Sequence, residues 1–145
     1  MKAEELMIGD KIRITDAETN VQSQKGVCAT VRMIEKEGGY WKIIVRPDNC
    51  KYDYAIEREE EFEPIPLTPG ILEKNGFKPL EEDSYIYEPL NKNNDYSIVI
   101  DMLVPFLSYI VKDSMPKSRY GGEIKFFHQL QHKIRECGIS KEIIL

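Results

Sequence analysis

Two histidines stand four residues apart in the segment HQLQH, residues 128–132. On a helix this spacing brings both imidazoles to one side, where His128 and His132 can share a metal ion, and Glu136 would follow one turn later. In the zinc-peptidase pattern HExxH, the residue after the first histidine is a glutamate that acts as the general base. Gln129 occupies that position and has no titratable proton, so it cannot act as a base. We therefore predict no catalytic residue and no cofactor.

The helix that would carry these histidines is expected over residues 123–137. Apolar side chains recur there at helical spacing and define a buried stripe, made of Ile124, Phe127, Leu130, Ile134 and Cys137. His128 and His132 fall beside this stripe rather than within it. A polar helix flank is therefore the main interpretation of the pair, and a metal held by His128, His132 and Glu136 is the minor one.

A second group of candidate residues precedes this helix, in residues 112–122. It consists of Lys112, Lys117, Arg119, Tyr120, Gly121 and Gly122. Paired glycines at a helix start leave backbone N–H groups open to an anion, and the basic side chains would add to that attraction. The pattern has no Walker-type spacing, so a surface loop is the competing interpretation.

Four aromatic residues, Tyr40, Trp41, Tyr52 and Tyr54, gather in the first half of the chain. Strand alternation would bury about every second one. Those that remain exposed could contact a peptide or protein partner.

Composition restricts the class of protein. Hydrophobic residues make up 41% of the 145 residues and charged residues 31%, as in a folded soluble domain. No apolar run is long enough for a membrane span, and the first residues do not resemble a secretory signal, so we expect a cytoplasmic protein. Three widely spaced cysteines, Cys28, Cys50 and Cys137, argue against a disulfide framework.

The charge is unevenly distributed. Residues 1–63 carry 10 basic and 14 acidic side chains, a net charge of −4, whereas residues 64–145 carry 10 and 11, a net charge of −1. An acidic first half is a poor ligand for phosphate backbones and suits a basic protein partner better.

The chain is expected to be an α+β protein in two parts. Short β-rich runs in residues 1–63 predict a small SH3-like β-barrel. The segment 64–66 (PIP) marks a boundary, because proline cannot donate to a strand ladder. Residues 64–145 then predict an α-β-β-β-α unit with an antiparallel sheet: a short helix capped by Thr68, three strands, the helix over 123–137, and a tail strand over 139–145. The two parts could also share one core.

Two segments resemble a known family. Residues 65–77 (IPLTPGILEKNGF) and 127–145 (FHQLQHKIRECGISKEIIL), after an opening LMIGD at residues 6–10, are similar to short uncharacterised proteins encoded by phages and mobile elements of gut bacteria. The two segments cover about a fifth of the chain. In that family glutamate often stands at the position of Gln129. The resemblance implies a role in host takeover or anti-defence, where proteins usually act by binding.

Together these patterns predict a non-catalytic protein that binds a protein partner, a host or defence component, through the acidic, tyrosine-bearing first part. A nucleotide- or nucleic-acid-binding module that uses residues 112–122 is the alternative. A metal-dependent hydrolase comes third.

Overall fold

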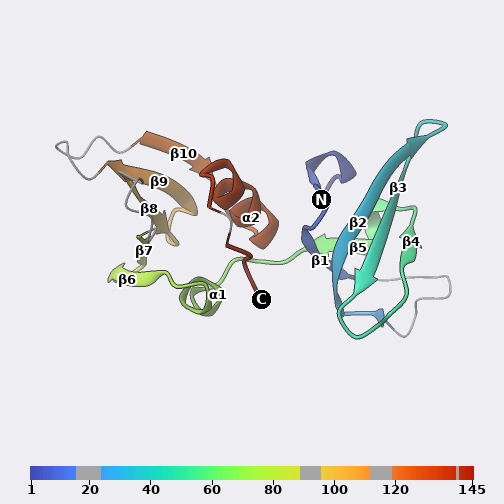
Figure 1. The fold of residues 1–145 in the computed structure, drawn as a ribbon, viewed down its shortest axis with the longest axis horizontal. Coiled ribbons are helices and arrows are strands. Elements are labelled where there is room, and N and C mark those ends of the chain that lie inside the picture. Colours follow the sequence, from blue (N-terminus) through green and yellow to red (C-terminus); the bar gives the residue numbers. More distant parts are fainter. Residues whose placement is uncertain (16–23, 89–95, 112–118, 140) are drawn as a thin grey trace. The chain divides into compact units, whose positions relative to one another are not determined.

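The computed structural model describes residues 1–15, 24–88, 96–111, 119–139 and 141–145. The chain divides into two compact units, Met1–Ile65 and Pro66–Leu145 (Figure 1). Each unit contains one five-stranded sheet, and every strand pairing in both sheets is antiparallel. The α+β class expected from the sequence is confirmed.

The sheet of the first unit has the strand order β4-β3-β2-β1-β5. Its edges are β4 and β5, which do not pair with each other within the described residues, so hydrogen bonds do not close a barrel. A 3-10 turn precedes β1, and another lies between β4 and β5. The elements are η1 (Ala3–Glu5), β1 (Lys11–Ile14), β2 (Cys28–Glu37), β3 (Tyr40–Pro47), β4 (Tyr54–Ile56), η3 (Glu59–Glu61) and β5 (Phe62–Pro64).

Alternation along the strands builds the core of this unit. In β1 the side chains of Ile12 and Ile14 are buried, and in β3 those of Ile43 and Val45 are buried, so one face of the sheet is apolar. Asp10 is also buried, and its carboxylate accepts the amide N–H of Met7 at 2.7 Å. This bond fixes the turn that leads into β1.

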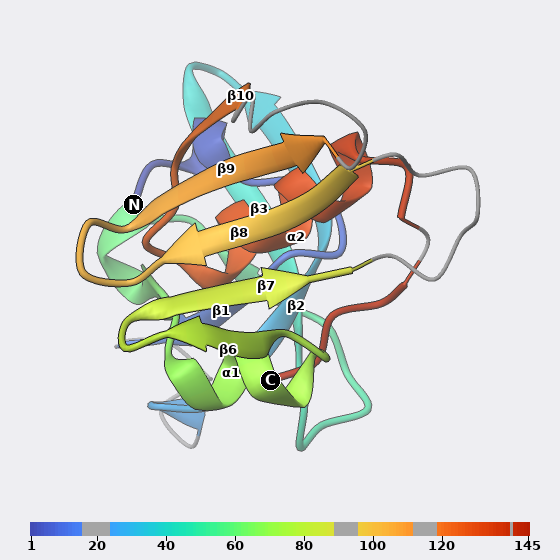
Figure 2. The same cartoon turned by 90° about the vertical axis from the view of Figure 1, so that its left-hand side faces the viewer.

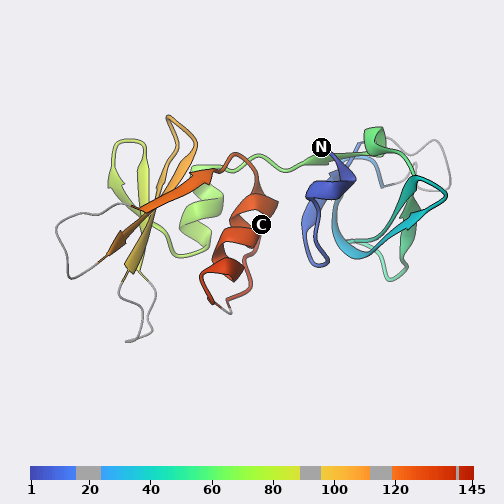
Figure 3. The ribbon, with the colours of Figure 1, turned by 90° about the horizontal axis from the view of Figure 1, so that it is seen from above.

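The second unit is a meander of five strands in the order β10-β9-β8-β7-β6, with helix α2 on one face (Figures 2 and 3). Its elements are α1 (Pro69–Lys74), β6 (Lys78–Glu81), β7 (Ser84–Tyr87), β8 (Tyr96–Asp101), β9 (Phe106–Val111), β10 (Arg119–Glu123) and α2 (Phe127–Glu136). The buried side chains Ile98 and Ile100 of β8 lie in this sheet, and α2 contributes Phe127, Leu130 and Ile134.

The α-β-β-β-α order predicted for this half is wrong in two places, because the structure has five strands between the helices. Pro79 lies in β6, an edge strand where a missing N–H leaves no ladder bond unmade. Gly121 and Gly122 lie in β10 rather than in a loop. The final helix begins at Phe127 instead of Glu123, and the described part of the tail over 139–145 forms no strand.

The predicted helix start at Thr68 is confirmed, since its hydroxyl oxygen accepts the N–H of Ile71 at 3.3 Å. The end of α1 holds the tail through Asn75. Its side-chain amide donates to the carbonyls of Ile71 (2.8 Å) and Ile144 (2.7 Å), and its oxygen accepts the N–H of Ile144 at 2.9 Å. The two segments that carry the family resemblance are therefore in direct contact.

Candidate functional site

The first unit contains an open hollow at the β2–β3 hairpin, with a volume of about 430 Å³. The hairpin turns at Gly38 and Gly39, whose φ angles of 58° and 90° correspond to a two-residue type I′ turn. β3 supplies one wall, and the chain that follows β4 supplies the other. The lining residues are Glu37, Gly38, Tyr40, Trp41, Lys42, Glu57 and Arg58.

Trp41 joins this hollow to the core. It alternates with Ile43 and Val45 along β3, so it shares their face of the sheet and packs against the core as a half-buried ring. Lys36 is its partner across the hairpin, and the Lys36 Nζ lies 4.8 Å from the centre of the Trp41 ring. Such a cation–π contact stabilises the position of the Trp41 ring and places the Lys36 ammonium group over its face.

Tyr40 differs from Trp41 in exposure, because 80% of its surface is open to solvent. An exposed tyrosine beside a half-buried tryptophan gives a binding surface apolar area with little conformational entropy to lose.

The far wall of the hollow is held by Glu61, which is itself buried. The Glu61 carboxylate accepts the N–H of Glu57 at 3.2 Å and pairs with the Arg58 guanidinium at 3.2 Å. In the sequence, residues 57–61 read as a charge run whose simplest interpretation is a solvated turn. The structure shows instead that one carboxylate of the run points inward and ties the wall together.

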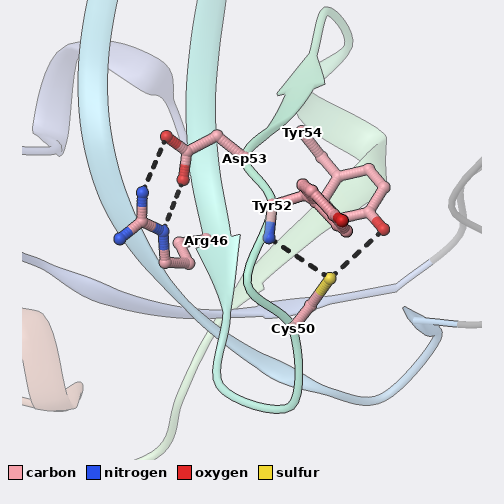
Figure 4. Close-up of polar contacts among 5 residues, drawn as sticks. All are labelled: Arg46, Cys50, Tyr52, Asp53 and Tyr54. Atoms are coloured by element: carbon pink, nitrogen blue, oxygen red, sulfur yellow. Dashed lines mark hydrogen bonds and ion pairs between the residues drawn. The ribbon is translucent and has the colours of Figure 1, made fainter.

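Tyr52 lies in the connection from β3 to β4, and Tyr54 is the first residue of β4 (Figure 4); neither lines the hollow. Tyr54 pairs with Val45, four residues along β3 from Trp41, which corresponds to about 13 Å. Tyr52 is 74% exposed. The structure therefore brings Tyr40 and Trp41 together and separates them from Tyr52 and Tyr54.

This connection has its own polar contacts (Figure 4). Arg46 donates two hydrogen bonds to the Asp53 carboxylate, at 2.7 and 3.1 Å. These bonds stabilise the charged carboxylate and so lower the pKa of Asp53. The Tyr54 hydroxyl lies 3.4 Å from the Cys50 sulfur, which also accepts the N–H of Tyr52 at 3.5 Å. The contact with the Tyr54 hydroxyl lowers the pKa of the Cys50 thiol, and the bond from the Tyr52 N–H adds a smaller effect in the same direction. The contact between Cys50 and Tyr54 also raises the pKa of Tyr54.

The helix start on which the anion site predicted over residues 112–122 depended is not found at the paired glycines. Lys112 and Lys117 lie outside the described residues. The backbone of Arg119, Tyr120, Gly121 and Gly122 belongs to β10, with a shift in register between Tyr120 and Gly122. The helix begins only at Phe127, so the paired glycines do not form a helix N-terminus.

His128 is buried, with 1% of its surface exposed, which corrects its expected place on a polar helix flank. Its ring stacks on Phe126, with centroids 5.9 Å apart, and meets the edge of the His132 ring at 5.7 Å. Glu136 pairs with Lys133 at 2.7 Å. Within the described residues, no group of three or more His, Cys, Asp or Glu side chains could hold a metal ion. The histidines thus pack as aromatic rings.

Gln129 has a structural task of its own. Its side-chain oxygen accepts the N–H of Lys125 at 2.8 Å and the N–H of Phe126 at 3.2 Å, so it caps the start of α2. A glutamate at this position could accept the same two bonds. Either residue would then bond to the backbone that precedes the helix.

Comparison of the chain with protein-family models, with curated proteins and with solved structures finds no match. No helix in the described part of the chain is both long and apolar enough to span a membrane.

Proposed function

We propose that the chain is a non-catalytic binding protein whose first unit holds a protein partner in the hollow at Tyr40 and Trp41. The observation that carries this proposal is that Tyr40 and Trp41, consecutive residues of β3, both line one open hollow, with Tyr40 80% exposed. Tyrosine and tryptophan dominate the binding energy of many interfaces because they bury large areas at low entropic cost.

The proposal extends to the architecture and context of this unit. The order β4-β3-β2-β1-β5, with a 3-10 turn between β4 and β5, supports an SH3-like arrangement for residues 1–63. The net charge of −4 over those residues favours a basic partner over a nucleic acid. From the family resemblance we propose a cytoplasmic protein of phage or mobile-element origin, acting on a host or defence component.

Two exposed tyrosines provide a matched test. Tyr40→Ala removes a ring that lines the hollow, whereas Tyr52→Ala removes an almost equally exposed ring outside it, at 80% and 74% exposure. Tagged wild-type protein and both variants are incubated with lysate of the native bacterial host, and the captured proteins are compared by quantitative mass spectrometry.

We expect a partner that wild type and Tyr52→Ala capture equally and that Tyr40→Ala loses. Truncation of a central interface tyrosine costs about 2 kcal/mol or more, which corresponds to roughly a 30-fold loss of affinity. If both variants capture the same partners as the wild type, the hollow is not the binding surface and the proposal is wrong.

A further inference from the structure

The edge of β3 continues past the end of β4, its neighbour in the sheet. β4 pairs only with Ile43, Ile44 and Val45, whereas β3 begins three residues earlier, at Tyr40. Arg58, the residue that would face Trp41 if β4 continued, instead precedes the turn η3. The start of β3 therefore has β2 on one side and no strand of the described chain on the other.

The type I′ turn determines which backbone groups face this open side. In a two-residue hairpin the closing residues, Glu37 and Tyr40, exchange both hydrogen bonds, and the pattern then alternates along the strand. The backbone groups of Tyr40 and Lys42 thus point to β2, and those of Trp41 point away from it. Within the described residues, no backbone hydrogen bond reaches Trp41 from this side.

Two carboxylates around this edge have no ion-pair partner within the described residues, although acidic and basic residues are equal in number there. Of the cations near Trp41, Lys36 lies over its ring and Arg58 pairs with Glu61. Glu37 and Glu57 are the two residues concerned, and Lys42 lines the hollow with them. A basic side chain that enters the hollow could therefore pair with either carboxylate.

We propose that an extended segment of the partner adds to the sheet beside Trp41 as a further strand and places a lysine or arginine in the hollow, near Glu37 and Glu57. This inference rests on the proposed function, because it specifies how the partner binds at the same hollow. An open strand edge supplies the main-chain bonds in such complexes, and adjacent pockets select the side chains. A basic side chain could also lie over the exposed Tyr40 ring.

The probe is a library of random linear nonapeptides displayed on filamentous phage and selected on the full chain. We expect selected peptides to contain a lysine or arginine flanked by β-forming residues. Synthetic copies should bind Tyr52→Ala as well as wild type, and they should lose roughly tenfold or more in affinity towards Tyr40→Ala. The double variant Glu37→Gln with Glu57→Gln should weaken binding, with a smaller effect at high salt.

Two measurements report on strand addition itself. The amide hydrogen of Trp41 should exchange with solvent at least about tenfold more slowly when the peptide is bound, while those of Tyr40 and Lys42, already bonded to β2, should change little. Methylation of alternate peptide nitrogens should weaken binding roughly tenfold at the positions that bond to β3, and little at the others.

The outcomes separate the two proposals. Peptides that depend on Tyr40 but leave the exchange of Trp41 unchanged, or that tolerate every N-methylation, would refute strand addition and leave the proposed function standing. Peptides without basic residues would refute the assigned chemistry of the partner. Selection that yields no peptide sensitive to Tyr40→Ala would refute both.

Discussion

Asn75 joins the end of α1 to the tail of the second unit, and its replacement by alanine should destabilise that unit. The side chain is buried, with 2% of its surface exposed, and makes three hydrogen bonds of 2.7 to 2.9 Å. Two of them reach Ile144, 69 residues further along the chain. Asn75 has a φ of −92° and a ψ of 12°, which alanine tolerates, so Asn75→Ala removes the bonds without straining the backbone.

The expected loss follows from these bonds. Each hydrogen bond contributes about 1 kcal/mol net, and a buried group left without a partner costs about 1 to 3 kcal/mol. The tail can partly separate and let its N–H and C=O reach water, which limits the second contribution. We expect the free energy of unfolding of the second unit to fall by about 2 to 4 kcal/mol.

Native-state hydrogen exchange measures this quantity unit by unit. The amides of Ile98 and Ile100 in β8 report on the opening of the second sheet, and those of Ile43 and Val45 in β3 report on the first. Glu73→Ala, an exposed change two residues earlier in α1, is the matched control and should change the exchange free energies by less than about 0.5 kcal/mol.

Asn75→Ala should lower protection in β8 and leave β3 unchanged. A loss below about 1 kcal/mol in β8, or an equal loss in both sheets, would refute the assignment of Asn75 as the anchor of the tail.

Three further predictions concern other contacts. Cys50 should be alkylated by iodoacetamide at lower pH than an ordinary thiol, because its lowered pKa increases the thiolate fraction. Tyr54→Phe removes the contact between the Tyr54 hydroxyl and the Cys50 sulfur, and should move the pH midpoint of alkylation upward. Mass spectrometry of the Cys50 peptide measures this midpoint, and an unmoved midpoint would contradict the prediction. In urea unfolding, Gln129→Ala should lower the stability by about 1 kcal/mol, whereas Gln129→Glu should keep the cap and cost less than about 0.5 kcal/mol. If both variants lose the same stability, the hydrogen bonds from the N–H groups of Lys125 and Phe126 contribute nothing. Asp10→Ala removes the buried carboxylate that accepts the Met7 N–H, and should lower the free energy of unfolding by about 2 kcal/mol. The fluorescence of Trp41 during unfolding measures this change, and a stability equal to wild type would show that the turn does not need the bond.

Local signals in the sequence predicted the elements that local chemistry determines. The cap at Thr68 predicted the start of α1, and the short β-rich runs in residues 1–63 predicted strands in the first unit. Residues 78–81 and 119–123 gave no such signal, because Pro79 and the paired glycines usually mark turns. Their strands form through pairing with β7 and β9, and that pairing is a property of the folded sheet.

The candidate site shows the same division. The aromatic residues of the first half could be named from the sequence, but not how far Tyr54 would lie from Trp41, since that depends on the register of β3 with β4. The role of Glu61 was hidden in a run of similar charges, and only its burial distinguishes it from Glu59 and Glu60. His128 was predicted to lie on a polar flank of the helix, but it is buried. A helical wheel gives the angles between side chains around the helix, but it does not show how much of the helix surface the rest of the unit covers.

The bond between Asn75 and Ile144 also bears on the order in which the chain folds during synthesis. The first unit is complete once β5 has emerged to pair with β1, so it can fold while later residues are still being added. In the second unit, α1 cannot make its contact with the tail until nearly all residues of the unit have emerged, because Ile144 lies 69 residues after Asn75. Contacts this distant in sequence form late and slowly. On the ribosome, the acidic unit with its aromatic hollow would therefore be available to a partner before the second unit is finished.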